Sequence, residues 1–224
     1  MAGKMDNGAA VALGLVAVVA AAGAVARSRR ENRSMLPAAM GVAALAGLGF
    51  AGGSRGGSAN VTTFEQMTPE NRAKVCGALQ GLMALLRALQ IETHEGHWTV
   101  KGGNYYGDHL LLQRIYAGGG GSPVLQDEID GLGERTVAYC GASFVDSPAV
   151  LRKTSTLVES WRKESSDPIK RALIAEEALQ FAVRETYDAL RATGSMPLGM
   201  DDFLMGLSSA HDTNRYLLQR RLAE

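Results

Sequence analysis

The sequence has no net charge and little cysteine. Lys and Arg together number 23, as do Asp and Glu, so the formal net charge at pH 7 is zero. This balance excludes a strongly basic nucleic-acid-binding protein as the simplest interpretation. Two cysteines, Cys76 and Cys140, are too few for a disulfide scaffold or a four-thiolate zinc site. They can form at most one bridge, and the sequence favours buried free thiols.

Strand-like alternation of apolar and polar residues is also missing over any useful length. Three long segments instead repeat apolar residues at steps of three or four. The first begins at Thr68-Pro69-Glu70, where an N-cap, a proline and an acid stand together, and we expect it to end at residues 101–103. The other two open near Asp167 and Asp201. These segments predict long helices.

A fourth helical segment, residues 105–139, is interrupted by four glycines, a serine and a proline at residues 118–123. Because each glycine costs about 1 kcal/mol relative to alanine in a helix, we expect this stretch to loop out. The pair Ser147-Pro148 predicts a short helix over residues 148–154. The sequence therefore predicts an all-α fold, a four-helix bundle with one split helix and a short helix in the middle crossover.

The zero net charge is the sum of a basic N-terminal part and an acidic remainder. Residues 1–60 hold six basic and two acidic residues, and nearly half of them are Gly or Ala. Residues 61–224 hold 17 basic and 21 acidic residues. We therefore divide the chain into a Gly/Ala-rich apolar helical extension, which ends in a flexible linker at residues 52–60, and a bundle domain at residues 61–224.

The extension contains two apolar runs, residues 9–26 and 35–53, each long enough to cross a bilayer as a helix. Four arginines between the runs predict a cytoplasmic loop, which would place the bundle on the far side of a membrane hairpin. Two alternatives remain: a tail packed against protein in a larger assembly, and a targeting peptide. We expect a membrane-associated or assembly-bound protein through residues 9–53, and a cytoplasmic one otherwise.

Three of the four histidines, His94, His97 and His109, fall within sixteen residues. His97 lies on the apolar stripe of its helix, where a single histidine is more often a core residue than a ligand. Asp130 and Glu134 strengthen the metal interpretation, because carboxylates four residues apart project from the same helix face. Two imidazoles and two carboxylates suit iron, zinc or manganese, and an iron site needs open positions for oxygen.

At this point the sequence resembles the Dps-type mini-ferritins of the ferritin-like superfamily. The two histidines are spaced by twelve residues, a tryptophan follows the first, and an arginine follows the last glutamate. The similarity in helix order extends over roughly the last 70% of the chain. The residues that carry the resemblance are His97, Trp98, Gly102, Asn104, Tyr105, His109, Asp130, Glu134 and Arg135.

The resemblance implies a homo-oligomeric shell of twelve subunits with a di-iron ferroxidase site at each two-fold interface. His97 and His109 would come from one subunit, and Asp130 and Glu134 from its partner. Fe(II) would be oxidised there by hydrogen peroxide or oxygen, and ferric iron stored inside the shell. The excess acid of the bundle domain fits the uptake of cations.

Two departures from the family pattern matter. Gln113 stands where the family usually has an aspartate, and a neutral amide is a poorer iron ligand. Residues 118–123 are an insertion, and only a looped-out insertion preserves the placement of the carboxylates. Gln113 is therefore a weaker candidate ligand. His94 and Glu95, which lie next to the motif, are also weaker candidates.

His211 and Glu176 also lie on inward stripes, but no pair of helices carries the E-x-x-H motif of an intra-bundle site. We therefore expect His211 to be a buried, hydrogen-bonded histidine.

Two functions from different classes follow. The first is an enzyme, a Dps-like iron-binding ferroxidase that sequesters ferric iron and protects against oxidative stress. The alternative is a structural or anchoring ferritin-like protein with weakened or lost ferroxidase activity, held in a membrane or larger assembly by its extension. Direct DNA binding is not expected, because the basic residues of the extension are largely confined to a seven-residue loop.

Overall fold

The computed structural model describes residues 67–145 and 147–223, which form six α-helices and one short 3-10 helix. The extension at residues 1–60, with its expected helices, lies outside the described residues. The elements are α2 (Pro69–Thr99), α3 (Tyr105–Ala117), α4 (Leu125–Cys140), η2 (Ala142–Val145), α5 (Ser147–Glu164), α6 (Pro168–Ala192) and α7 (Leu198–Leu222).

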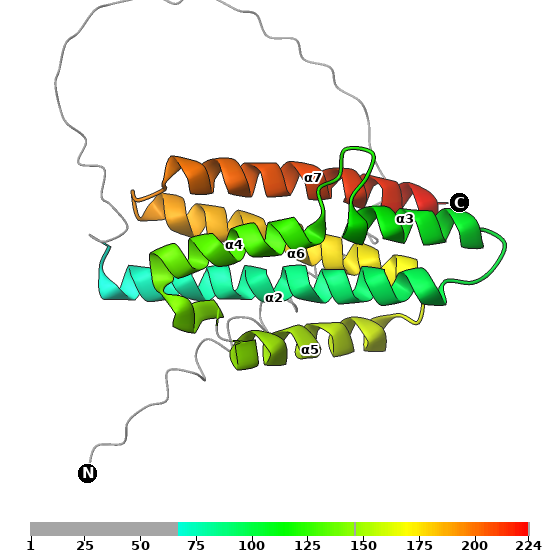
Figure 1. Cartoon of the computed structure of the whole chain (residues 1–224), viewed down its shortest axis with the longest axis horizontal. Helices are drawn as coiled ribbons and strands as arrows, with labels where there is room; N and C mark the ends of the chain where they lie inside the picture. Colours follow the sequence, from blue (N-terminus) through cyan, green and yellow to red (C-terminus); the bar gives the residue numbers. More distant parts are fainter. Residues whose placement is uncertain (1–66, 146, 224) are drawn as a thin grey trace, which may run out of the picture.

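The helices are arranged as the predicted four-helix bundle (Figure 1). Helices α3 and α4 together run antiparallel to α2, and α7 runs antiparallel to α6. Helix α2 packs against both α4 and α6, while α5 lies along the outer side of α2. The all-α fold and the split second helix are therefore confirmed.

Helix α2 begins where the sequence predicts. The Thr68 hydroxyl accepts a hydrogen bond from the Asn71 amide at 3.3 Å, and Pro69 occupies the first turn. The helix ends at Thr99, just before the predicted stop. Gly102 follows with φ of 101°, a conformation that favours glycine.

Helix α2 is buried on more than the single face that its periodicity predicts. Residues 81–86 are all buried in succession, which brings every side of the helix into contact with protein. Helix α5 provides the additional cover. Helix α2 also has the length and hydropathy of a membrane-spanning helix, but 67% of its most apolar window is buried in the bundle, as in the core helix of a soluble protein.

The helix in the middle crossover is longer than predicted. The sequence predicts residues 148–154, whereas α5 continues to Glu164. The extra turns are held by contacts that the local pattern does not reveal. Leu157 and Trp161 are buried, and the Arg162 guanidinium binds the carboxylates of Glu92 and Glu95 on α2.

Residues 118–123 loop out between α3 and α4, as predicted. Gly118, Gly119, Gly120 and Gly121 all have positive φ angles, which other residues adopt at a cost. Arg114 donates a hydrogen bond to the Gly120 carbonyl at 2.8 Å, and Ser122 donates one to the Asn214 side chain of α7 at 3.0 Å. The insertion is therefore anchored without being built into a helix.

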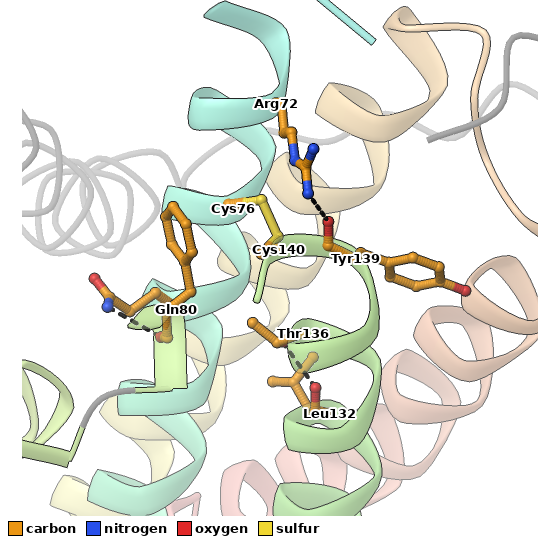
Figure 2. Close-up of a disulfide and its surroundings, with 8 residues drawn as sticks. Arg72, Cys76, Gln80, Leu132, Thr136, Tyr139 and Cys140 are labelled. Carbon is orange, nitrogen blue, oxygen red and sulfur yellow. Dashed lines mark hydrogen bonds between the residues drawn. A yellow bond between two sulfur atoms is a disulfide. The ribbon is translucent and has the colours of Figure 1, made fainter. Parts of the chain in front are cut away.

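Cys76 and Cys140 form a disulfide, which corrects the expectation of free thiols (Figure 2). Because α4 runs antiparallel to α2, its last residue returns to the first turns of α2, and the two Cα atoms lie 5.7 Å apart. Arg72 also joins the two helices here, donating a hydrogen bond to the Tyr139 carbonyl at 3.1 Å. The sulfur atoms are inside the protein, so the expectation of buried cysteines is correct.

We predict that reduction of this disulfide destabilises the bundle. A bridge between residues 64 apart restricts the unfolded chain and stabilises the folded state by about 4 kcal/mol. Denaturant unfolding of the Cys76→Ser, Cys140→Ser variant, with and without reductant, measures this loss. The reductant should lower the midpoint of the wild type and leave that of the variant unchanged. An equal effect on both proteins would contradict the prediction.

Candidate metal centre

His97, near the end of α2, and His109, in the first turns of α3, form a stacked pair. Their ring centroids are 3.7 Å apart, and the planes are inclined by 26°. His97 Nδ1 lies 3.1 Å from the His109 carbonyl oxygen, and His109 Nδ1 lies 3.0 Å from the His97 carbonyl oxygen. The two residues therefore hold each other through reciprocal hydrogen bonds.

These contacts determine which nitrogen of each ring is available. A carbonyl oxygen only accepts, so the proton of each neutral imidazole must be on Nδ1. Each Nε2 atom then carries a lone pair that the described contacts do not use. Histidine ligands to metals are commonly oriented by such a hydrogen bond from the other ring nitrogen. The pair is thus arranged to offer two nitrogen ligands.

The close approach of α2 and α3 is supported on both sides of the pair. Gly96 precedes His97, and a Cβ atom there would lie 3.1 Å from the Leu112 side chain of α3. Asp108 precedes His109 and is buried, and Arg221 near the end of α7 holds its carboxylate with contacts of 2.6 and 3.1 Å. The histidine pair is therefore fixed by three helices.

Asp130 and Glu134 lie on α4, one turn apart, and both are exposed in the single chain. Gln126 donates a hydrogen bond to Asp130 Oδ1 at 2.9 Å. Arg135 does not pair with its neighbour Glu134. It donates to the Gly131 carbonyl and covers the Phe203 ring at 4.5 Å.

The structure brings the two histidines together but does not bring all four residues into one cluster. Within residues 67–145 and 147–223, no group of three or more His, Cys, Asp or Glu side chains is arranged to hold a metal ion. One chain thus presents an imidazole pair at the junction of α2 and α3 and a carboxylate pair on α4.

The weaker candidate ligands differ in their surroundings. Glu95 is half-exposed and forms an ion pair with Arg162 at 2.5 Å, so the guanidinium already occupies part of its carboxylate. His94 is exposed and lies between the rings of Trp98 and Tyr116, each with its centroid 4.5 Å away. Gln113 is exposed on α3, one turn after His109.

A second group of titratable residues lies inside the bundle. His211 of α7 is 1% exposed, and its Nδ1 lies 2.7 Å from Glu176 Oε2 of α6. Its Nε2 lies 3.1 Å from Glu128 Oε2 of α4. The carboxylates approach opposite nitrogens of the ring. The expectation of a buried, hydrogen-bonded histidine is therefore correct.

Glu128 is the member of this triad that the sequence analysis missed. It lies between Leu125 and Leu132 on the buried stripe of α4. An acid at such an apolar position is the feature of the sequence that could have identified it. Burial alone would lower the pKa of His211. The charges of Glu176 and Glu128 and their hydrogen bonds outweigh burial and raise that pKa to about 10. His211 is therefore an imidazolium at neutral pH.

We predict that this proton makes the bundle less stable in alkali. The pKa rises from about 6.5 in the unfolded chain to about 10 in the folded protein, so the stabilisation is complete below pH 6.5 and lost as the pH approaches 10. Denaturant unfolding between pH 8 and 10 should show a loss of a few kcal/mol in the wild type. The non-titrating variant His211→Gln should start less stable and show a flatter profile. Parallel profiles would count against the assignment.

The described helices have the ferritin-like fold. A solved structure of Dps from Microbacterium arborescens in the high iron form matches this chain with a TM-score of 0.54 and 26% sequence identity. The match covers 70% of this chain and 97% of that chain.

The sequence comparison leads to the same family. The chain is 40% identical over 57 residues to DNA protection during starvation protein 2 of Deinococcus radiodurans, a match that spans about a quarter of each chain. No family model matches the sequence. Both relatives are Dps proteins, so the resemblance to the Dps-type mini-ferritins that the motif indicates is confirmed.

Proposed function

We propose that this protein is a ferroxidase that oxidises Fe(II) with peroxide or oxygen and sequesters the ferric product in a homo-oligomeric shell. Two Fe(II) ions would each give one electron to hydrogen peroxide, which takes up two protons and leaves as two molecules of water. This reaction would remove Fe(II) and hydrogen peroxide, which together cause oxidative damage. Iron is the substrate, and the same ligands would also hold zinc or manganese.

The observation that carries this proposal is the reciprocal hydrogen bonding of His97 and His109. It leaves two Nε2 lone pairs on rings whose orientation is fixed. The likeness to Dps proteins supports an iron-binding, ferritin-like function at the level of the family.

We propose that Asp130 and Glu134 of the partner subunit complete the site across a two-fold interface. The exposure of both carboxylates and the incomplete ligand set of one chain support this arrangement. Because a two-fold interface places the same surface on both subunits, each dimer would hold two equivalent sites. A dodecamer built from such dimers would form the storage shell.

Iron oxidation tests the assigned ligands. We expect His97→Ala and Asp130→Ala each to lower the initial rate of peroxide-driven Fe(II) oxidation by at least about tenfold, because each removes a ligand. Asp127→Ala is the matched control, since Asp127 is also an exposed acid of α4. Wild-type rates in both ligand variants would overturn the site.

Mixed assembly tests whether the site is shared between subunits. A dimer of one His97→Ala chain and one Asp130→Ala chain would contain one site with both defects and one intact site. Random co-refolding should therefore restore roughly a quarter of wild-type activity. If each chain builds its own site, the mixture stays as inactive as its parents.

We further propose that residues 1–60 attach the assembly to a membrane or a larger particle. The two apolar runs and the arginine loop support this role. The disulfide supports the orientation in which the bundle faces away from the cytoplasm, because disulfides persist in oxidising compartments.

The second candidate function is a mainly structural role with weakened iron turnover. Gln113 in place of the family's aspartate favours it.

Deletion of residues 1–60 tests the proposed attachment. Full-length protein should sediment with the membrane or host particle, and the truncated bundle should move to the soluble fraction while keeping its helical content. As a control, substitution of the arginines at residues 27–33 by glutamine should change the orientation of the chain more than its attachment. Identical fractionation of the full-length and truncated proteins would exclude the attachment.

A further inference from the structure

Two side-chain amides in series connect the C-terminal third of α2 to the carboxylate of Asp130. Gln90 of α2 donates from Nε2 to Gln126 Oε1 at 3.1 Å. Gln126 of α4 donates in turn from Nε2 to Asp130 Oδ1 at 2.9 Å. Gln126 and Asp130 are four residues apart, so they stand on the same face of the helix.

The two hydrogen bonds run in one direction, from Gln90 through Gln126 to Asp130. Gln126 receives a hydrogen bond on its oxygen and gives one from its nitrogen, so a flip of its amide would lose both contacts. Because a carboxylate only accepts, Asp130 determines which end of the Gln126 amide faces it, and the Gln126 oxygen is left to accept from Gln90. Gln126 in turn holds one oxygen of Asp130. The second oxygen, Oδ2, has no partner within the described residues.

The neutrality of the donor distinguishes Asp130 from most carboxylates that have a partner. An arginine next to a carboxylate competes with a metal cation for the same charge, whereas an amide orients the carboxylate without adding positive charge. No Lys or Arg forms an ion pair with Asp130 or Glu134 within the described residues. Every other described carboxylate with a side-chain partner forms an ion pair with arginine or with His211. These carboxylates are Glu92, Glu95, Asp108, Glu128, Glu176, Asp188 and Asp212.

We propose that Gln126, held on its other side by Gln90, is a positioning residue that sets the Asp130 carboxylate for binding a divalent cation through Oδ2. The inference rests on the proposed function, because it assigns a role to a neighbour of a proposed ligand. It extends the site by two residues, the half-buried Gln90 and the exposed Gln126.

Cobalt binding to the full-length protein tests this role. Co(II) replaces Fe(II) without being oxidised by air, and its visible absorption reports the ligands around it. We expect Gln126→Leu to weaken Co(II) binding about tenfold and to change the spectrum, as the loss of a partner of a metal ligand does. Gln90→Leu should have a smaller effect.

Three further measurements separate positioning from other causes. Gln219→Leu makes the same change on the exposed face of α7 and should bind Co(II) as the wild type does. The melting temperature and sedimentation of Gln126→Leu should also match the wild type, because Gln126 is exposed. Asp130→Ala measures the contribution of the ligand itself.

The outcomes are distinct. Weaker binding in Asp130→Ala together with wild-type binding and spectrum in Gln126→Leu would overturn the positioning role and leave the proposed site intact. Wild-type binding in Asp130→Ala would overturn both, because no ligand would then remain for Gln126 to position. Weaker binding in both variants, with unchanged assembly, supports the inference.

Discussion

The bundle depends on one buried proton. His211 carries it between Glu176 and Glu128, and these three residues belong to α7, α6 and α4. Without the proton, two carboxylates would face each other inside the protein around a neutral ring, with a large desolvation cost. With it, each nitrogen of the ring donates to one helix. The charged triad therefore joins α7 to both α6 and α4, the helix that carries Asp130 and Glu134.

The charges of this protein are sorted by the kind of partner they have. Inside the bundle and along its crossover, acids are matched by arginine or by an imidazolium, as Glu92 is by Arg162 and Arg171. On the exposed side of α4, Asp130 has only an amide and Glu134 has no ion-pair partner within the described residues. Paired acids hold helices together, whereas unneutralised acids attract cations. Structure and proposed chemistry therefore use separate sets of carboxylates.

Much of the fold follows from local patterns in the sequence, because those patterns have local causes. The cap at Thr68, the stop after Thr99 and the glycine interruption all act within a few residues. What the sequence does not reveal depends on contacts between distant residues. The bond between Cys76 and Cys140 requires the antiparallel return of α4, and the length of α5 depends on acids of α2.

The candidate site also has features that local sequence patterns predict and features that depend on distant contacts. The histidine spacing and the carboxylates on one helix face are readable from the motif. The reciprocal bonds of His97 and His109 are not, since they require two helix ends to meet at a particular distance. Gln126 gives no signal on its own, because an exposed glutamine on a helix is ordinary. The buried triad was partly accessible: Glu128, Glu176 and His211 each interrupt an apolar stripe, and three charged interruptions in one core must compensate one another.

The disulfide has a consequence for the order in which the protein can come apart. Cys76 and Cys140 enclose a closed loop of chain, and His97, His109, Asp130 and Glu134 all lie within it. If α5, α6 and α7 separated from the bundle, α2 and α4 would still be covalently joined at one end as a helical hairpin. The segment that carries every proposed ligand is therefore topologically closed, and it stays closed when the C-terminal half is separated from it.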